Sequence, residues 1–582
     1  MAKIENTRHS LSHLLAAVVL KKFPDVKLGI GPVIENGFYY DFLLPRSLAP
    51  EDLKDFEKEI KKLISQKLSF TIKKIAIAEA KKIFKDQPFK LELINEYTRE
   101  KRPLSIYKTG DVFIDLCAGG HVKNSGEINA DAFKLTSIAG AYWRGNEKNP
   151  QLQRIYGVAF ESKKELNEYF KRLEEAEKRD HRIIGKKLDL FIFSDLVGKG
   201  LPLFTEKGSI IRRELERFIV EEEIKRGYKH VYTPEIARVE LYKTSGHYPY
   251  YKDTMYPLMK IDEDELILRP MTCPHHFQLY SYKPRTYKEL PIRIAELAKQ
   301  FRYEKSGELT GLMRVRTFCL ADAHIILAKE QAENEIHEVL NLIEFVTSKL
   351  GFHKETDYRY RLSLGDRKNA KKYYKDDKSW NLAENVLRKV LKERKSPFFE
   401  AQDEAAFYGP KIDIQMKNFL GKEDTAFTVQ YDFVMPKRFN LTYIDKGGQK
   451  KEPIVIHRSS IGAIERTIAF ILEKYAGALP LWLSPVQVKI LNITERNQKY
   501  SESIYEKLRE TDIRVELDDA NKTIGKKIRD AELEKIPYIL VVGDKEEKTG
   551  TVAVRQRGEG DLGSQKLSDF LQKIQKKITS KE

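Results

Sequence analysis

The chain is poor in cysteine, with three residues in a length of 582. So few thiols exclude the dense disulfide framework of a small secreted protein and fit a reducing cytoplasm. Long hydrophobic runs are also missing, because no apolar stretch approaches the ~20 residues of a membrane-spanning helix. Residues 14–20 are apolar, but they continue into Lys21 and Lys22 without a small-residue cleavage site. This favours a buried helix over a signal peptide, so we expect a cytoplasmic protein with no membrane partner.

Acidic residues are outnumbered by basic ones. The chain has 104 Lys and Arg against 87 Asp and Glu, a formal net charge of +17. This surplus favours a polyanionic partner, with nucleic acid the leading candidate, although many soluble proteins are basic. A hydrophobic content of 41% fits a globular protein. A chain this long is expected to hold roughly three to four domains.

The order of patterns along the chain indicates three blocks. Residues 1–180 mix helices with short strands, and the charged run 163–182 predicts a linker helix or a solvated helix face. A large α+β block follows, and the Pro-rich turn at 480–485 marks its end. Strands and helices then alternate to residue 578, which predicts a compact α/β domain. We place the domains at residues 1–183, 184–483 and 484–582.

The most informative stretch is residues 301–324. Two apolar runs, 292–303 and 312–327, flank a gap with two glycines, which predicts an antiparallel hairpin. Alternation on the returning strand is expected to place Arg314, Arg316 and Phe318 on one face. Guanidinium groups bind phosphate and an aromatic ring stacks on a base, so this face suits a nucleotide. Charge alone favours a solvated hairpin face instead.

The order of residues in this stretch resembles motif 2 of the class II aminoacyl-tRNA synthetases, in the form found in threonyl-tRNA synthetases. Residues 207–235 resemble motif 1, the dimer-interface helix and strand, and residues 462–466 resemble motif 3. The resemblance runs from His9 to Ile578 in family order. It implies a multidomain α+β fold: an antiparallel-sheet catalytic core, an N-terminal α+β editing domain and a C-terminal α/β anticodon-binding domain.

The same resemblance implies a homodimeric ligase that joins L-threonine to threonine tRNA, using ATP with Mg²⁺. In the family, the equivalent of Arg302 holds the α-phosphate and the amino-acid carboxylate, and that of Glu304 contacts the adenine. Arg314 and Arg466 match residues at the γ-phosphate, and Phe318 matches the ring that stacks on adenine. Dispersal of charge by the arginines and Mg²⁺ would stabilise the transition state of adenylate formation.

A metal site also follows from the resemblance. Cys273, His324 and His457 match the zinc ligands of the family, although their wide spacing carries no local metal signature. Three ligands leave coordination positions open, as catalytic zinc requires. The resemblance therefore implies one Zn²⁺ per subunit that binds the amino and hydroxyl groups of threonine, with Asp322 accepting a hydrogen bond from that hydroxyl. His275 and His276 are expected to be ordinary surface or packing residues.

The pocket shows both matches to the family and departures from it. Tyr408 and Gln430 match amino-acid pocket residues, and Lys411 is expected to face the substrate. The family usually has glutamine where Leu320 stands, and Gln-Cys-Gly where residues 425–427 read Thr-Ala-Phe. These departures concern details of the pocket and leave the reaction class unchanged.

The N-terminal block has its own cluster of reactive side chains. His9 and His13 share a helix face, and Cys117 and His121 follow much later. These residues are compatible with a metal site or with buried core histidines. They resemble the editing domain of threonyl- and alanyl-tRNA synthetases, which implies hydrolysis of mischarged seryl-tRNA. Between an editing site with a metal and one without, we favour the site without. The residues expected around the ester are His9, His13, Cys117, His121, Lys90, Tyr40 and Asp115.

The last hundred residues resemble the anticodon-binding domain of several class II synthetases. The matched positions are Asn521, Arg529, Glu546 and Arg555. Arg and Glu can read base edges, although each of these residues is also compatible with an exposed loop charge. The further small domain that most bacterial members carry before the editing domain is expected to be absent.

Two other functions fit parts of the chain. One is a class II ligase for serine, proline or alanine, and the metal set with Asp322 argues against it. The other is a catalytically silent paralogue that only binds RNA. The presence of both Arg302 and Arg466 argues against that alternative.

Overall fold

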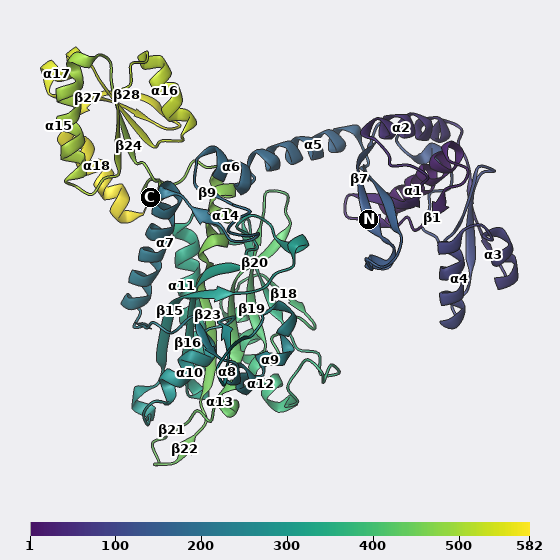
Figure 1. The fold of residues 1–582 in the computed structure, drawn as a ribbon, viewed down its shortest axis with the longest axis horizontal. Coiled ribbons are helices and arrows are strands. Elements are labelled where there is room, and N and C mark those ends of the chain that lie inside the picture. The colour runs from purple at the N-terminus through teal and green to yellow at the C-terminus, as the bar shows by residue number, and fades with distance from the viewer. Residues whose placement is uncertain (1, 582) are drawn as a thin grey trace. The chain divides into compact units, whose positions relative to one another are not determined.

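The computed structural model describes residues 2–581, which divide into two compact units between Glu174 and Glu175 (Figure 1). Helix α5 (Lys163–Lys178) begins in the first unit and ends in the second. The linker helix expected at 163–182 is in fact two helices, because Asp180 caps the start of α6 (His181–Lys187) by accepting a hydrogen bond from the Arg182 N–H. Within residues 2–581, no helix is both long enough and apolar enough to cross a bilayer.

The first unit is built around the helix α1 (Ala2–Lys22), which packs against a sheet with the order β1-β3-β8-β7. The apolar face of α1 carries Leu11, Leu14, Leu15 and Val18, all buried as the spacing predicts. A separate three-stranded sheet has the order β4-β5-β6. The main elements are β1 (Lys27–Leu28), β2 (Val33–Ile34), β3 (Gly37–Leu43), α2 (Pro50–Ser65), β4 (Phe70–Lys74), α3 (Ile77–Ile83), α4 (Pro88–Arg99), β5 (Ser105–Thr109), β6 (Phe113–Leu116), β7 (Phe133–Tyr142) and β8 (Gln151–Ala159).

The second unit contains an eight-stranded sheet with the order β11-β15-β16-β23-β20-β19-β17-β18. Neighbouring strands are antiparallel except for the pairs at the two edges, β11–β15 and β17–β18, so the expected antiparallel core is confirmed. The strands are β11 (Lys229–His230), β15 (Ile292–Phe301), β16 (Thr317–Leu327), β17 (Tyr358–Ser363), β18 (Phe398–Ala401), β19 (Lys411–Lys417), β20 (Glu423–Asp432) and β23 (Ile454–Ala463).

Helices enclose one apolar core with this sheet. The helices α7, α11, α12 and α14 share a single buried cluster with β16, β19, β20 and β23. Their bounds are α7 (Glu206–Lys225), α11 (Ala332–Lys349), α12 (Asp377–Glu393) and α14 (Ile464–Tyr475). Shorter elements surround the sheet: α8 (Val239–Ser245), α9 (His247–Tyr250), α10 (Cys273–Ser281), α13 (Met435–Arg438) and the small sheet of β12 (Ile236–Arg238), β13 (Met259–Ile261) and β14 (Asp264–Leu268).

The alternation of side chains along β16 separates this core from a polar face. Cys319, Ala321, Ala323, Ile325 and Leu327 enter the apolar core. The residues between them point the other way, because successive side chains of a strand lie on opposite faces. These are Phe318, Leu320, Asp322 and His324, which line a cavity. The strand therefore holds the sheet together with one face and supplies a site with the other.

The hairpin expected at 292–327 is confirmed, since β15 and β16 pair in antiparallel register from Ile292↔Ile326 to Phe301↔Thr317. The expectation that Arg314, Arg316 and Phe318 share a face is wrong for Arg316. Both arginines precede the first residue of β16, so strand alternation does not govern them. Arg316 instead donates to the Glu304 carbonyl oxygen (3.0 Å) and lies over the Tyr303 ring.

The C-terminal residues form a five-stranded sheet with the order β25-β24-β26-β27-β28. The first three strands are parallel and the last two antiparallel, and most elements agree with the alternation expected from the sequence. The elements are β24 (Val488–Asn492), α15 (Gln498–Arg509), β25 (Val515–Asp518), α16 (Ile524–Leu533), β26 (Tyr538–Val542), α17 (Asp544–Thr549), β27 (Thr551–Gln556), β28 (Gly560–Lys566) and α18 (Leu567–Ser580).

Candidate functional site

A cavity of about 530 Å³ lies on the polar face of the eight-stranded sheet. It is lined from β15, β16, β19, β20, β23, α10 and α14, so sheet register brings together residues that are far apart in the chain. The structure gathers here every residue proposed for catalysis, metal and substrate binding in the central block: Cys273, Arg302, Glu304, Arg314, Phe318, Asp322, His324, Tyr408, Lys411, Gln430, His457 and Arg466. The catalytic, metal-binding and substrate-binding roles of these residues remain predictions.

One end of the cavity holds three metal-binding side chains. One donor atom each from Cys273, His324 and His457 lies within 4.8 Å of the others, and all three residues are buried. The two histidines are direct register partners across β16 and β23, and their rings are perpendicular with centroids 4.7 Å apart. Cys273 is the first residue of α10. One thiol and two imidazoles are a donor set that suits Zn²⁺.

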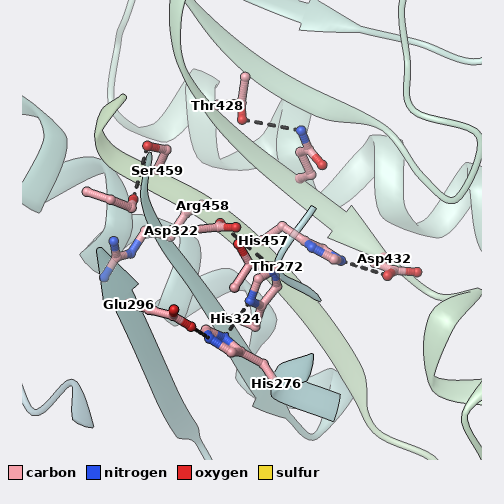
Figure 2. Close-up of polar contacts among 12 residues, drawn as sticks. Thr272, His276, Glu296, Asp322, His324, Thr428, Asp432, His457, Arg458 and Ser459 are labelled. Atoms are coloured by element: carbon pink, nitrogen blue, oxygen red, sulfur yellow. Dashed lines mark hydrogen bonds and ion pairs between the residues drawn. The ribbon is translucent and has the colours of Figure 1, made fainter. Parts of the chain in front are cut away.

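Both histidines are held by hydrogen bonds behind the cluster (Figure 2). Nε2 of His457 donates to Oδ2 of Asp432 at 2.7 Å, and Asp432 is fixed because its Oδ1 accepts the backbone N–H groups of Val434 and Met435. Nδ1 of His324 lies 2.8 Å from Nδ1 of His276. Of the two positions expected for His276, surface or packing, burial rules out the surface, and the ring is also hydrogen-bonded to the cluster.

Burial controls the charge of this cluster. It raises the pKa of the Cys273 thiol well above its usual range, and the carboxylates of Asp322 and Asp432 raise it further. Burial also lowers the pKa of His324, so this imidazole is neutral, which is the form that binds a metal. A divalent cation would reverse the preference of Cys273, because thiolate is the ligand form of cysteine.

The other end of the cavity is cationic. Burial lowers the pKa of the Arg466 guanidinium, and the neighbouring charges of Arg302 and Arg314 lower it further. Arg302 lies over the Phe318 ring with its Cζ 5.2 Å from the centroid, and Arg314 pairs with Glu304 at 3.0 Å. Crowded like charges are costly without a counter-ion, so this end is suited to an anion. The aromatic ring beside it is suited to a base.

The middle of the cavity carries residues that can hold a small polar molecule. Tyr408 donates a short hydrogen bond to Oε1 of Gln430. Lys411 is bound to Asp413 at 2.7 Å. Burial raises the pKa of Asp322. Its Oδ1 lies 3.9 Å from Nε2 of His324, so the carboxyl group is next to the three metal-binding side chains.

Sequence reasoning missed several residues of the lining. Gln300 donates to Thr272 (3.0 Å) and lies near Asp322, and His247 is buried with its Nδ1 bonded to the Ser245 hydroxyl at 2.7 Å. Gln300 could have been found from the expected hairpin, because it pairs with Phe318 and cross-strand partners share a face. His247 had no such signal. Leu320 and Thr425, two of the departures from the family pattern, also line the cavity.

The first unit contains a second cluster of donors. One donor atom each from His9, His13, Cys117 and His121 lies within 4.8 Å of the others. The thiol of Cys117 is 3.5 Å from Nε2 of His9 and 3.4 Å from Nε2 of His121. Burial lowers the pKa of His121 to about 2 and raises that of Cys117 to about 11. All these groups are therefore uncharged near neutral pH.

The remaining residues expected around the ester form a buried network beside this cluster. Lys90 of α4 pairs with Oδ1 of Asp115 at 2.5 Å, and the Tyr40 hydroxyl donates to Oδ2 at 2.6 Å. Nε2 of His13 approaches the same carboxylate at 4.0 Å, which links the network to the donor cluster. The elements α1, β3, α4 and β6, with the loop that follows β6 and carries Cys117 and His121, thus bring the seven residues together.

The four residues proposed for the C-terminal block differ in their surroundings. Asn521 and Arg529 are exposed. Arg555 is 28% exposed and lies between Glu532 (3.8 Å) and Asp561 (3.7 Å). Glu546 is buried, and its carboxylate accepts the Gly543 N–H and the Ser564 hydroxyl, so it caps α17. A base contact by Glu546 would have to compete with these bonds.

Comparison with known families gives the class of the protein. Residues 256–475 match the tRNA synthetase class II core domain (G, H, P, S and T), residues 487–577 match an anticodon binding domain, and residues 104–156 match the threonyl and alanyl tRNA synthetase second additional domain. The antiparallel sheet, its cavity and these matches define a class II aminoacyl-tRNA synthetase.

Individual relatives narrow the class further. The threonine–tRNA ligase of Geobacillus sp. strain WCH70 is 47% identical over 574 residues, covering 98% of this chain and 88% of the relative. Threonine–tRNA ligase 1 of Bacillus subtilis is 47% identical over 569 residues, covering 97% and 87%. A solved structure of the RNA binding domain of threonyl-tRNA synthetase from Cryptosporidium parvum has a TM-score of 0.64 at 35% identity, covering 68% of this chain and 98% of that one.

The chain belongs to the threonine–tRNA ligase family. It attaches L-threonine to tRNA in a reaction that uses ATP and Mg²⁺. A ligase for serine, proline or alanine and a silent RNA-binding paralogue, the two other functions considered from the sequence, are set aside.

Proposed function

We propose that the central cavity forms threonyl-adenylate, with a zinc ion held by Cys273, His324 and His457. The observation that carries this proposal is the convergence of these three donors at one end of a cavity whose other end is cationic and aromatic. When bound there, zinc would supply a Lewis acid with open positions for an amino and a hydroxyl group. Asp322, whose Oδ1 lies 3.9 Å from Nε2 of His324, would accept a hydrogen bond from that hydroxyl.

The arginines then account for the chemistry at phosphorus. The threonine carboxylate oxygen attacks the α-phosphorus of ATP, a new C–O–P linkage forms, and pyrophosphate leaves with the electrons of the broken P–O bond. Arg302 would neutralise the α-phosphate and the attacking carboxylate, while Arg314 and Arg466 neutralise the leaving group together with the Mg²⁺ of ATP. Arg302 and Arg466 are already desolvated, and Arg314 is already paired with Glu304, so little rearrangement is needed to stabilise the transition state.

The cysteines supply a matched test of the zinc site. Full-length protein should contain one zinc per chain, and Cys273→Ser should lose both the zinc and threonine-dependent ATP–pyrophosphate exchange. Cys319→Ala is the control, because Cys319 lies on β16 with His324 but points into the apolar core on the other face. Cys117→Ser should keep the zinc if the first unit holds no metal. Full exchange activity in metal-free protein would contradict the proposal.

We further propose that the first unit, within residues 1–183, hydrolyses mischarged seryl-tRNA. Serine keeps the hydroxyl that the zinc site would read and lacks one methyl group, which supports only about 1–3 kcal/mol of discrimination, or 10–200-fold. A second, hydrolytic site compensates for this small margin. The buried Lys90–Asp115–Tyr40 network and the neutral cluster of His9, His13, Cys117 and His121 would surround the ester. One of these groups, or the terminal ribose hydroxyl of the tRNA, would position the attacking water.

The remaining predictions concern binding and assembly. Residues 484–582 would hold the anticodon, with Asn521, Arg529 and Arg555 better exposed for it than Glu546.

The chain would form a cytoplasmic homodimer through the motif 1 region. Ile224 and Tyr232 of that region support this, because they are 56% and 96% exposed. Sedimentation of the full chain tests it, and a monomer at micromolar concentration would contradict it.

A further inference from the structure

Two buried residues outside the proposed ligand set extend from one of its members. Nε2 of His276 lies 3.2 Å from Oε2 of Glu296, and its Nδ1 lies 2.8 Å from Nδ1 of His324 (Figure 2). His276 is 0% exposed and Glu296 3%. His276 belongs to α10, Glu296 to β15 and His324 to β16, so the chain of contacts joins three elements.

Glu296 is fixed as an ionised carboxylate. Its Oε1 accepts from Arg269 at 2.9 Å, and its Oε2 accepts from the Thr233 hydroxyl at 2.7 Å. Burial alone would raise the pKa of Glu296, but the hydrogen bonds from His276 and Thr233 and the charge of Arg269 lower it to about 2. An ionised carboxylate only accepts hydrogen bonds, so the proton in the contact with His276 belongs to the imidazole.

The proton on Nε2 of His276 determines where the proton of His324 lies. When that proton is the only one on the two His276 nitrogens, Nδ1 keeps its lone pair. The contact between the two Nδ1 atoms then requires His324 to donate from its own Nδ1. Neutral His324 consequently carries its free lone pair on Nε2, the nitrogen on the side of Asp322 and the cavity. The opposite tautomer of His324 would place a proton on that nitrogen, where no metal could bind.

We propose that His276 is a positioning residue, which, with Glu296, selects the metal-binding tautomer and the ring orientation of His324. The inference rests on the zinc site proposed above. Each of the two histidine ligands is then connected to a carboxylate. His457 donates directly to Asp432, whereas His324 is connected to Glu296 through the imidazole of His276. Hydrogen-bonded partners of this kind orient a ligand and strengthen it.

The neighbouring histidine makes a matched control available. His275 lies next to His276 on α10 and is also buried, at 8% exposure, but its ring packs beside Tyr242. His275→Ala removes the same volume from the same helix without removing the acceptor of His324. His276→Asn restores an acceptor, because the amide oxygen of asparagine stands close to the position of Nδ1 in histidine, although the contact with Glu296 is lost.

The experiment measures zinc affinity in the full-length chain by competition with a chromophoric chelator, for wild type, His276→Ala, His276→Asn and His275→Ala. Thermal unfolding is followed in parallel. We expect His276→Ala to bind zinc about 10–100-fold more weakly. His275→Ala should stay near wild type, and His276→Asn should recover most of the loss. Replacement of zinc by Co²⁺ should show an altered visible spectrum in His276→Ala and an unaltered one in His275→Ala.

Other outcomes overturn the inference in recognisable ways. Equal zinc affinity in His276→Ala and wild type would mean that His324 needs no positioning partner. Equal losses in His276→Ala and His275→Ala, with matching falls in the unfolding temperature, would reduce the role of His276 to packing. If wild type and Cys273→Ser contain the same amount of zinc, the proposed zinc site fails and the positioning role fails with it.

Discussion

Arg458 and Glu223 form an ion pair that is almost completely buried, with Nη1 of the guanidinium 2.5 Å from Oε1 of the carboxylate. Arg458 follows His457 on β23, and Glu223 lies near the end of α7, the helix that resembles motif 1. The Ser460 hydroxyl donates to the same carboxylate oxygen, and the guanidinium lies over the Tyr228 ring. The strand that supplies a proposed metal ligand is therefore joined to the helix proposed for dimerisation.

Loss of one partner of this pair should destabilise the second unit strongly. Arg458→Ala leaves the Glu223 carboxylate buried without its counter-charge, and such changes cost about 3–5 kcal/mol. The double variant Arg458→Met with Glu223→Met should recover much of this loss, because no unpaired charge remains. Urea unfolding of the three proteins tests both statements. Equal stability of wild type and Arg458→Ala would show that the pair is not needed for the fold.

Arg302→Ala should suppress adenylate formation while leaving the fold intact. Removal of a group that stabilises developing charge typically costs about 10²–10³-fold in rate. ATP–pyrophosphate exchange with threonine measures this step without tRNA. Arg555→Ala is the comparison, since it should raise the KM for tRNA and leave exchange nearly unchanged. A normal exchange rate in Arg302→Ala would remove Arg302 from the chemistry, and equal losses of exchange in both variants would contradict the division of roles.

His121→Ala should leave threonine charging near normal and let seryl-tRNA accumulate. The reason is that His121 lies in the first unit, where its Nε2 is 3.4 Å from the Cys117 thiol. Lys90→Ala should do the same, with an added loss of stability because its partner Asp115 stays buried. The measurement is serine charging of threonine tRNA by wild type and each variant. If neither variant accumulates seryl-tRNA, these residues do not carry editing.

Glu296 should contribute to stability in a pH-dependent way. Its folded pKa of about 2 lies below the ordinary value of 4.5, so its contribution is complete above about pH 4.5 and is lost as the pH falls toward 2. A shift of this size corresponds to at most about 3 kcal/mol. Glu296→Gln should therefore be less stable than wild type at pH 7, with a difference that shrinks toward pH 3. Calorimetric midpoints across this range test the prediction, and a difference that stays constant with pH would contradict it.

The outcome along β15 and β16 shows how far local pattern reaches. Apolar runs around a glycine-bearing gap predicted the hairpin, which is confirmed. In the folded strand, period-2 alternation puts Phe318, Asp322 and His324 on one face, because a strand has only two faces. The same rule failed for Arg316, which lies before the strand begins. Local periodicity therefore predicts the face of a side chain inside a strand. Beyond the ends of the strand, the geometry of the turn determines its direction instead.

The sequence by itself determined the family, the order of the structural blocks and the residue types available for chemistry, because these depend on local pattern and on motifs read along the chain. Only the tertiary structure decided which of those residues meet. Antiparallel register placed His324 opposite His457, and the packing of α10 on β15 and β16 set His276 between His324 and Glu296. Glu546 gained a distant partner in the same way, when β28 brought the Ser564 hydroxyl to its carboxylate. Contacts of this kind depend on strand pairing between distant segments, and no spacing in the sequence records them.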